Sequence, residues 1–142
     1  GLDQYLYVCK ALYPGDPLIP GVSQASRMPL PLNDGGIIVK VEAAYWRRAY
    51  SIHGWFVRNV QNGQDDCAEY TVQVSEIERL RDICREILDA RGDQREDLQD
   101  HHLPTSIIYT NYEDEIGRTE ELLTKILNAK LEDTYYVYTS SF

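Results

Sequence analysis

The chain has 142 residues, 43% of them hydrophobic, and carries a formal net charge of −9 at pH 7. This length and composition are typical of a single globular domain and exclude a disordered chain. No apolar run approaches the roughly 18–20 residues that a membrane-spanning helix needs, so we expect no membrane contact. Because a nucleic-acid binder needs a basic surface, the acidic charge also argues against direct binding of DNA or RNA.

The acidic residues are concentrated in the second half of the chain. Residues 1–75 contain seven acidic and six basic residues, whereas residues 76–142 contain sixteen acidic and eight basic residues. An acidic surface of this kind keeps a protein in solution, and it also complements a partner with a basic surface. The charge alone leaves both interpretations open.

Taken in chain order, the local patterns predict about four to five strands and about three helices. Aromatic and β-branched residues over 4–10 predict a first strand, and the Pro and Gly residues over 13–36 predict a long loop. The elements predicted after this loop are a strand or helix lead-in at 37–41, a helix at 43–61, a strand at 68–74, a helix at 76–90 opened by a capping box between Ser75 and Glu78, a polar excursion at 92–102, a strand at 106–110, a helix at 113–131 and a strand at 134–139. The irregular connections predict a small α+β domain over 1–142, with a mainly antiparallel sheet covered on one face by helices.

Both tryptophans lie in the predicted helix at 43–61. Placed at 100° per residue, the apolar residues of this segment form one arc, which includes His53. A histidine in such an arc is more often a hydrogen-bonded core residue than a catalyst. The opposite side carries Trp55 together with three basic residues, Arg47, Arg48 and Arg58.

A tryptophan on the polar side of an amphipathic helix needs an explanation. The loop at 13–36 covers it, or Arg48 or Arg58 stacks on it as a cation–π pair. Alternatively, Trp55 is an interface anchor, since Trp and Arg are enriched among the residues that dominate binding energy.

A second candidate site follows the helix, at Asp65, Asp66 and Cys67. Its carboxylates are the kind of ligand that Mg²⁺ or Ca²⁺ prefers. Cys67 and His53 are also the residue types of a nucleophile and its base, with Asp66 to orient the imidazole. The opposing interpretation is a polar turn capped by an aspartate side chain, followed by a cysteine that acts as a small buried hydrophobe.

The sequence lacks the familiar cofactor and metal motifs. The three cysteines, Cys9, Cys67 and Cys84, are an odd number without zinc-site spacing, which favours a reducing cytosol over a disulfide framework. Neither a P-loop nor a Gly-x-Gly-x-x-Gly motif is present. We therefore predict no catalytic residues, no metal and no cofactor.

Several blocks of the chain resemble a family of small uncharacterised proteins encoded by tailed bacteriophages and prophages. The central match is Ala-Tyr-Trp-Arg-Arg-Ala at 44–49, Ile-His-Gly-Trp-Phe-Val at 52–57, Asn-Val-Gln-Asn-Gly at 59–63 and Asp-Asp-Cys at 65–67. Further matches lie at 1–7, 103–105, 112–115 and in the C-terminal strand that ends at 140–142. The resemblance covers most of the chain except the Pro-rich loop and residues 92–102. It implies a phage context and brings no established activity. Together with the cysteine pattern, this context leads us to expect a location in the host cytoplasm.

Together these observations lead to a functional hypothesis. We expect a phage accessory protein that inhibits or modulates a host protein with a basic surface, in an anti-CRISPR-like role that occludes a nucleic-acid-binding site. The residues expected to contact the partner are Trp55, Arg47, Arg48, Arg58, Glu113, Asp114 and Glu115. One alternative is a small-ligand or metal-binding protein or enzyme with a site formed by His53, Asp65, Asp66 and Cys67. Another is a structural protein that forms homo-oligomers through Trp55.

Overall fold

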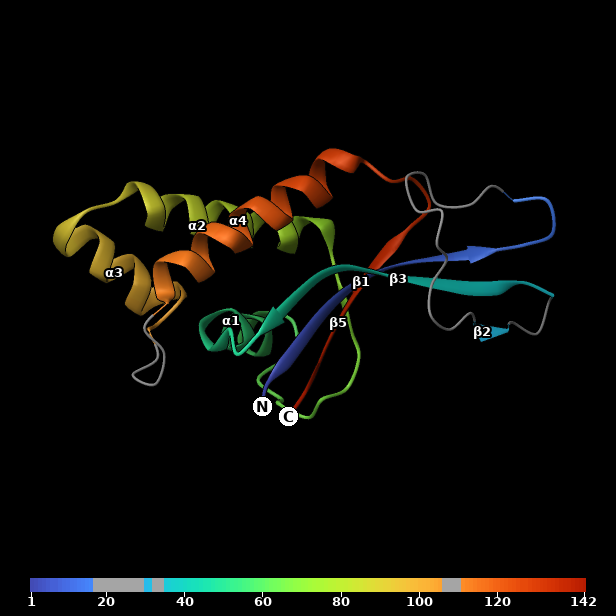
Figure 1. Cartoon of the computed structure of the whole chain (residues 1–142), viewed down its shortest axis with the longest axis horizontal. Helices are drawn as coiled ribbons and strands as arrows, with labels where there is room; N and C mark the ends of the chain where they lie inside the picture. The colour runs from blue at the N-terminus through green and yellow to red at the C-terminus, as the bar shows by residue number, and fades with distance from the viewer. Residues whose placement is uncertain (17–29, 32–34, 106–110) are drawn as a thin grey trace.

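The computed structural model describes residues 1–16, 30–31, 35–105 and 111–142 (Figure 1). The strands in these residues are β1 (Asp3–Leu12), β2 (Leu30–Pro31), β3 (Ile37–Arg47), β4 (Tyr70–Val72) and β5 (Tyr135–Ser141). The helices are α1 (Tyr50–Asn59), α2 (Val74–Asp89), α3 (Gly92–His102) and α4 (Tyr112–Ala129). The strands form one antiparallel sheet in the order β2-β3-β1-β5-β4, which confirms the predicted α+β class.

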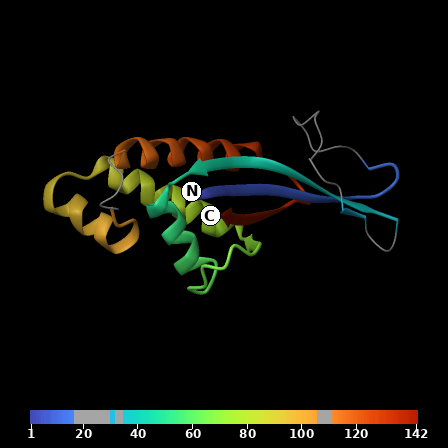
Figure 2. The ribbon, with the colours of Figure 1, turned by 60° about the horizontal axis from the view of Figure 1, so that its bottom comes forward.

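The core lies between the sheet and three of the helices. Alternate residues of β1 are buried on this side, as expected for a strand with one covered face. Leu6 and Val8 of this strand join one cluster with buried side chains of α1, α2 and α4. Figures 1 and 2 show the helices gathered at one end of the sheet, with α3 at the end of the molecule opposite β2.

Most predicted elements match the structure closely. The strands predicted at 4–10, 68–74 and 134–139 and the helices predicted at 76–90 and 113–131 are β1, β4, β5, α2 and α4, with ends displaced by at most two residues. Two details differ. The cap of α2 uses Gln73, whose backbone N–H donates to Glu76 Oε1 at 2.9 Å, in place of Ser75 and Glu78. Two residues of the predicted long loop form β2, which pairs with β3.

The helix predicted at 43–61 is wrong over its first part. Residues up to Arg47 continue β3 and pair with β1, where Asp3 faces Arg47. The β-branched and aromatic side chains of this segment favour a strand. Arg48 then takes a left-handed conformation with φ of 56°, and its N–H donates to the carbonyl of Leu2 at 2.8 Å. Only after this turn does α1 begin, at Tyr50.

The polar excursion predicted at 92–102 is the helix α3. It has no buried residue, so it lacks the apolar stripe by which helices are recognised in sequences. Half-buried Leu98 packs against the core cluster, and Arg95 forms an ion pair with Glu113 of α4. The strand predicted at 106–110 lies outside the described residues.

Candidate functional site

Trp55 is a core residue, and its predicted place on the exposed side is wrong. Only 1% of its surface is accessible. Its ring meets the edge of Phe56, with centroids 5.3 Å apart and an interplanar angle of 87°. The guanidinium of Arg79, from α2, lies 5.5 Å from the Trp55 ring centroid. A cation–π pair therefore exists, but its arginine comes from a neighbouring helix and the tryptophan is no interface anchor.

The three arginines that were predicted beside Trp55 do not form one patch. Arg47 and Arg48 lie in β3 and the turn that follows it, where they line one cavity. Arg58 lies at the other end of α1 and borders a different depression. Its Nη2 donates to the carbonyl of His102 at 2.9 Å, which ties α1 to the end of α3.

His53 is buried and both of its ring nitrogens are occupied. Nδ1 lies 2.7 Å from the hydroxyl of Tyr138, and Nε2 lies 2.9 Å from Oδ1 of Asp65. Burial raises the pKa of Tyr138, so its hydroxyl keeps its proton and donates to Nδ1. Nε2 then carries the imidazole hydrogen, which Asp65 accepts. This is the hydrogen-bonded core histidine that the apolar arc favours.

The remaining residues of the predicted ligand site point to other partners. Asp66 accepts hydrogen bonds from the Tyr70 hydroxyl at 2.8 Å and from the N–H of Ala68 at 3.1 Å, which lower the pKa of its carboxyl. Cys67 is exposed and has φ of 59°, so it is not the buried hydrophobe expected from sequence. Asp65, rather than Asp66, orients the imidazole. The geometry supports a capped polar turn in place of a Cys–His catalytic pair.

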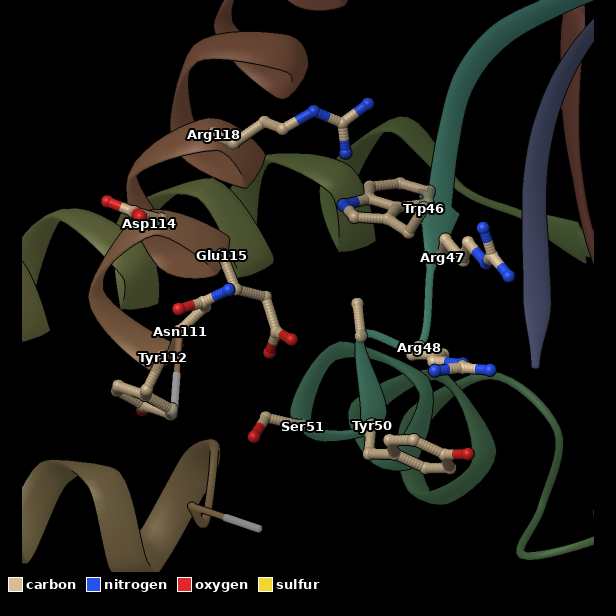
Figure 3. A pocket seen from close by; sticks show the side chains of 11 residues that line it. Trp46, Arg47, Arg48, Tyr50, Ser51, Asn111, Tyr112, Asp114, Glu115 and Arg118 are labelled. Carbon is tan, nitrogen blue, oxygen red and sulfur yellow. The ribbon is translucent and has the colours of Figure 1, made fainter. Parts of the chain in front are cut away.

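A cavity of about 410 Å³ opens between the end of β3, the start of α1 and the first turn of α4 (Figure 3). It brings together residues that the sequence separates by sixty or more positions. Its lining includes four residues predicted as partner contacts, Arg47, Arg48, Asp114 and Glu115, and seven others, Trp46, Ala49, Tyr50, Ser51, Asn111, Tyr112 and Arg118. No local pattern in the sequence links the lining residues at 46–51 with those at 111–118.

Several polar groups of the cavity wall are already hydrogen-bonded to the protein. Trp46 Nε1 donates to Thr119 Oγ1 at 2.9 Å, and Ser51 Oγ donates to the carbonyl of Pro104 at 2.6 Å. The Tyr112 hydroxyl donates to the carbonyl of Leu103 at 2.7 Å. These bonds hold the walls in place and leave their side chains with little capacity for further donation.

Glu115 is different, because no described residue forms a hydrogen bond or ion pair with its carboxylate. Figure 3 shows this carboxylate directed from α4 into the space above Ser51. Burial raises the pKa of Glu115 from its ordinary value of 4.5 to about 7. A half-buried, perturbed carboxylate in a cavity is a common feature of functional sites. This cavity is therefore the strongest candidate site in the described residues.

The raised pKa of Glu115 predicts a specific dependence of stability on pH. Between pH 4.5 and 7 the folded protein binds more protons at this site than the unfolded chain does, so stability falls as pH rises through this window. Because solvent screens this half-buried group, we expect the free energy of unfolding to fall by about 1–2 kcal/mol across this window. Glu115→Gln should therefore exceed the wild type in free energy of unfolding by this amount at pH 8, and match it near pH 4.5.

Urea denaturation at the two pH values measures this difference. Glu121→Gln, an exposed position on the same helix, is the matched control and should show no pH-dependent gain. Equal stability of Glu115→Gln and wild type at pH 8 would show that the Glu115 carboxylate is well solvated or paired.

No family model, curated protein or solved structure matches this chain. In the part of the chain that the structure describes, no helix is long and apolar enough to cross a membrane. Within the same residues, no group of three or more His, Cys, Asp or Glu side chains is placed to hold a metal ion.

Proposed function

We propose that this protein binds a basic surface of a partner protein through α3. The observation that carries the proposal is a set of carboxylates on this helix that are exposed and form no ion pair with any described residue. The set, here called the α3 stripe, consists of Asp93, Glu96, Asp97 and Asp100.

The spacing of the α3 stripe places all four carboxylates on one face. Positions i, i+3, i+4 and i+7 fall within an arc of about 100° on an α-helix and span about 10 Å of its axis. The opposite face holds Leu98, which packs on the core, and Arg95, which pairs with Glu113. The only arginine or lysine of α3 is thus engaged elsewhere, and the stripe faces away from the protein.

This arrangement has a cost in the free protein. Like charges at i,i+3 and i,i+4 destabilise a helix by about 0.2–0.5 kcal/mol per pair, and the stripe contains four such pairs. A complementary basic surface would remove this repulsion and gain attraction that steers association. The position of α3 at one end of the molecule leaves the stripe open to a large partner (Figure 1).

The resemblance to phage proteins supplies the biological form of this proposal. In it the partner is a host protein, the α3 stripe covers a basic, nucleic-acid-binding surface, and the result is inhibition or modulation of that host protein in the cytoplasm. An anti-CRISPR-like inhibitor is the concrete case. Self-association through Trp55 is not part of the proposal, because Trp55 is buried.

Charge reversal on the stripe tests the proposal. The variant Glu96→Lys/Asp97→Lys removes the centre of the stripe, and Glu42→Lys/Glu132→Lys changes the net charge equally at two exposed positions outside the helices. Bacterial proteins captured by the wild type at 50 mM salt should include a partner that the control variant also captures. The stripe variant should capture at least about tenfold less of this partner. Capture should also weaken in 300 mM salt. A lack of any such salt-sensitive partner, or one held equally by the stripe variant, would contradict the proposal.

A further inference from the structure

The cavity beside Glu115 has the chemistry of a small-ligand site that is separate from the α3 stripe. Its volume of about 410 Å³ lies within the usual range of pockets for small organic molecules. The hydroxyls of Ser51 and Tyr112 and the indole N–H of Trp46 are bonded to the protein itself. The Glu115 carboxylate faces the cavity and forms no hydrogen bond or ion pair with a described residue. It can only accept hydrogen bonds when ionised.

The basic residues around the cavity do not neutralise this carboxylate. Arg118 Nη2 donates to the carbonyl of Tyr45 at 2.6 Å. The guanidinium of Arg48 lies against Gly1, and Figure 3 shows the heads of Arg47 and Arg48 directed away from Glu115. No described residue therefore pairs with the ionised carboxylate, and a ligand with a positive charge can take that place.

The rest of the wall indicates what kind of positive group fits. Three aromatic residues, Trp46, Tyr50 and Tyr112, line the cavity together with Glu115. A carboxylate among aromatic rings favours an organic ammonium group, because the rings attract a cation through their faces and shelter its apolar part. The net charge of −9 also favours the approach of cations.

We propose that this cavity binds a small organic amine whose ammonium group pairs with the carboxylate of Glu115. The carbon skeleton of the amine lies against the aromatic wall. An unpaired, half-buried carboxylate lowers the stability of the empty protein, and the amine relieves this by supplying the missing charge and hydrogen-bond donors. Binding is strongest above neutral pH, where Glu115 is ionised, and below the pKa of the amine.

Two amines and their neutral counterparts test the proposal at pH 8. Tyramine and butylamine carry the ammonium group, whereas tyrosol and butanol replace it with a hydroxyl on the same skeleton. At saturating concentration at least one amine should raise the Tm of the wild type by about 2–5 °C. The neutral compounds should leave the Tm unchanged. Absence of a shift with both amines, or an equal shift with the neutral compounds, would overturn the proposal.

The two tryptophans provide a local readout of the same binding. Trp46 lines the cavity and Trp55 does not, so their indole N–H signals in a ¹⁵N-labelled protein report separately on the site and on the rest of the core. Titration with the amine should move the Trp46 signal and leave that of Trp55 in place. Movement of both signals equally, or of neither, would contradict binding in the cavity.

A matched pair of variants completes the test. Glu115→Gln keeps the shape of the side chain and removes its charge, so the affinity for the amine should fall at least about tenfold. Glu121→Gln makes the same change at an exposed position of α4 and should bind as wild type does. Because Glu115→Gln is expected to be more stable than wild type at pH 8, a loss of binding cannot be attributed to unfolding. Unchanged affinity in this variant would overturn the role of Glu115.

Discussion

Replacing Trp55 with alanine should lower the free energy of unfolding by about 3–5 kcal/mol. The side chain is 1% exposed, packs edge-on against Phe56 and lies beneath the guanidinium of Arg79. Its removal opens a large cavity among residues of α1 and α2 that cannot fully collapse, and it also ends the cation–π contact. Urea denaturation followed by circular dichroism measures the change without relying on tryptophan fluorescence.

A second aromatic truncation serves as the control for this prediction. Phe142 is 65% exposed at the C-terminal end of the chain, so Phe142→Ala should cost well under about 1 kcal/mol. A tryptophan that serves as an exposed binding anchor would behave like Phe142, with little loss of stability. Such a result for Trp55→Ala would restore the interface interpretation and refute the packing described above.

The sequence misplaced Trp55 because the position of one helix boundary was wrong. The helix predicted at 43–61 includes Trp46, but Trp46 belongs to β3, where side chains alternate in direction. The turn at Arg48 separates the two elements. Once α1 is taken alone, Trp55 falls within the buried face that also contains Ile52 and Phe56.

The helix α3 was not predicted from the sequence, because it lacks an apolar stripe. Helices are recognised from sequence by a stripe of apolar residues, as in α2, where Ile77, Leu80 and Cys84 follow this spacing. In α3 the periodic feature is the α3 stripe of carboxylates, with Leu98 as the one apolar residue of the helix. The i, i+3, i+4, i+7 spacing of the acidic residues was present in the sequence and would have revealed the helix.

The candidate cavity was only partly accessible to sequence reasoning. Glu115 and Arg48 are both predicted as partner contacts, but no pattern in the sequence predicts that they line one cavity. Their meeting depends on how α4 crosses the end of β3, which the hydrogen bond between Trp46 and Thr119 helps to fix. Long-range contacts of this kind leave no local pattern in a single sequence. The aromatic and β-branched residues of β1, by contrast, were sufficient to predict the strand itself.

Replacing His53 with alanine should lower the free energy of unfolding by about 2–4 kcal/mol. The imidazole is 5% exposed, so its loss leaves a cavity under the sheet. It also leaves the hydroxyl of Tyr138 without its acceptor in a fully buried position, which adds the cost of an unsatisfied polar group. Urea denaturation at pH 7 measures the loss.

A double-mutant cycle separates the hydrogen bond from the packing. Tyr138→Phe removes the donor alone and should cost about 1–3 kcal/mol. In the double variant His53→Ala/Tyr138→Phe, neither partner is left unsatisfied. Its loss of stability should therefore be smaller than the sum of the two single losses by at least about 0.5 kcal/mol. Additive losses would mean that His53 and Tyr138 are not coupled.

The two neighbouring aspartates provide the last control. Asp65 accepts from Nε2 of His53, but its side chain is 44% exposed and water can replace the contact, so Asp65→Asn should cost less than about 1 kcal/mol. Asp66 bonds to Tyr70 and does not contact His53, so Asp66→Asn should not alter the coupling between His53 and Tyr138.

Because Tyr138 also interacts with Gln4, whose amide bonds the backbone of Ala49, the network ties the start of α1 to the sheet. His53 is thus expected to act on stability. If His53→Ala kept the free energy of unfolding of the wild type, His53 would again be a candidate catalyst.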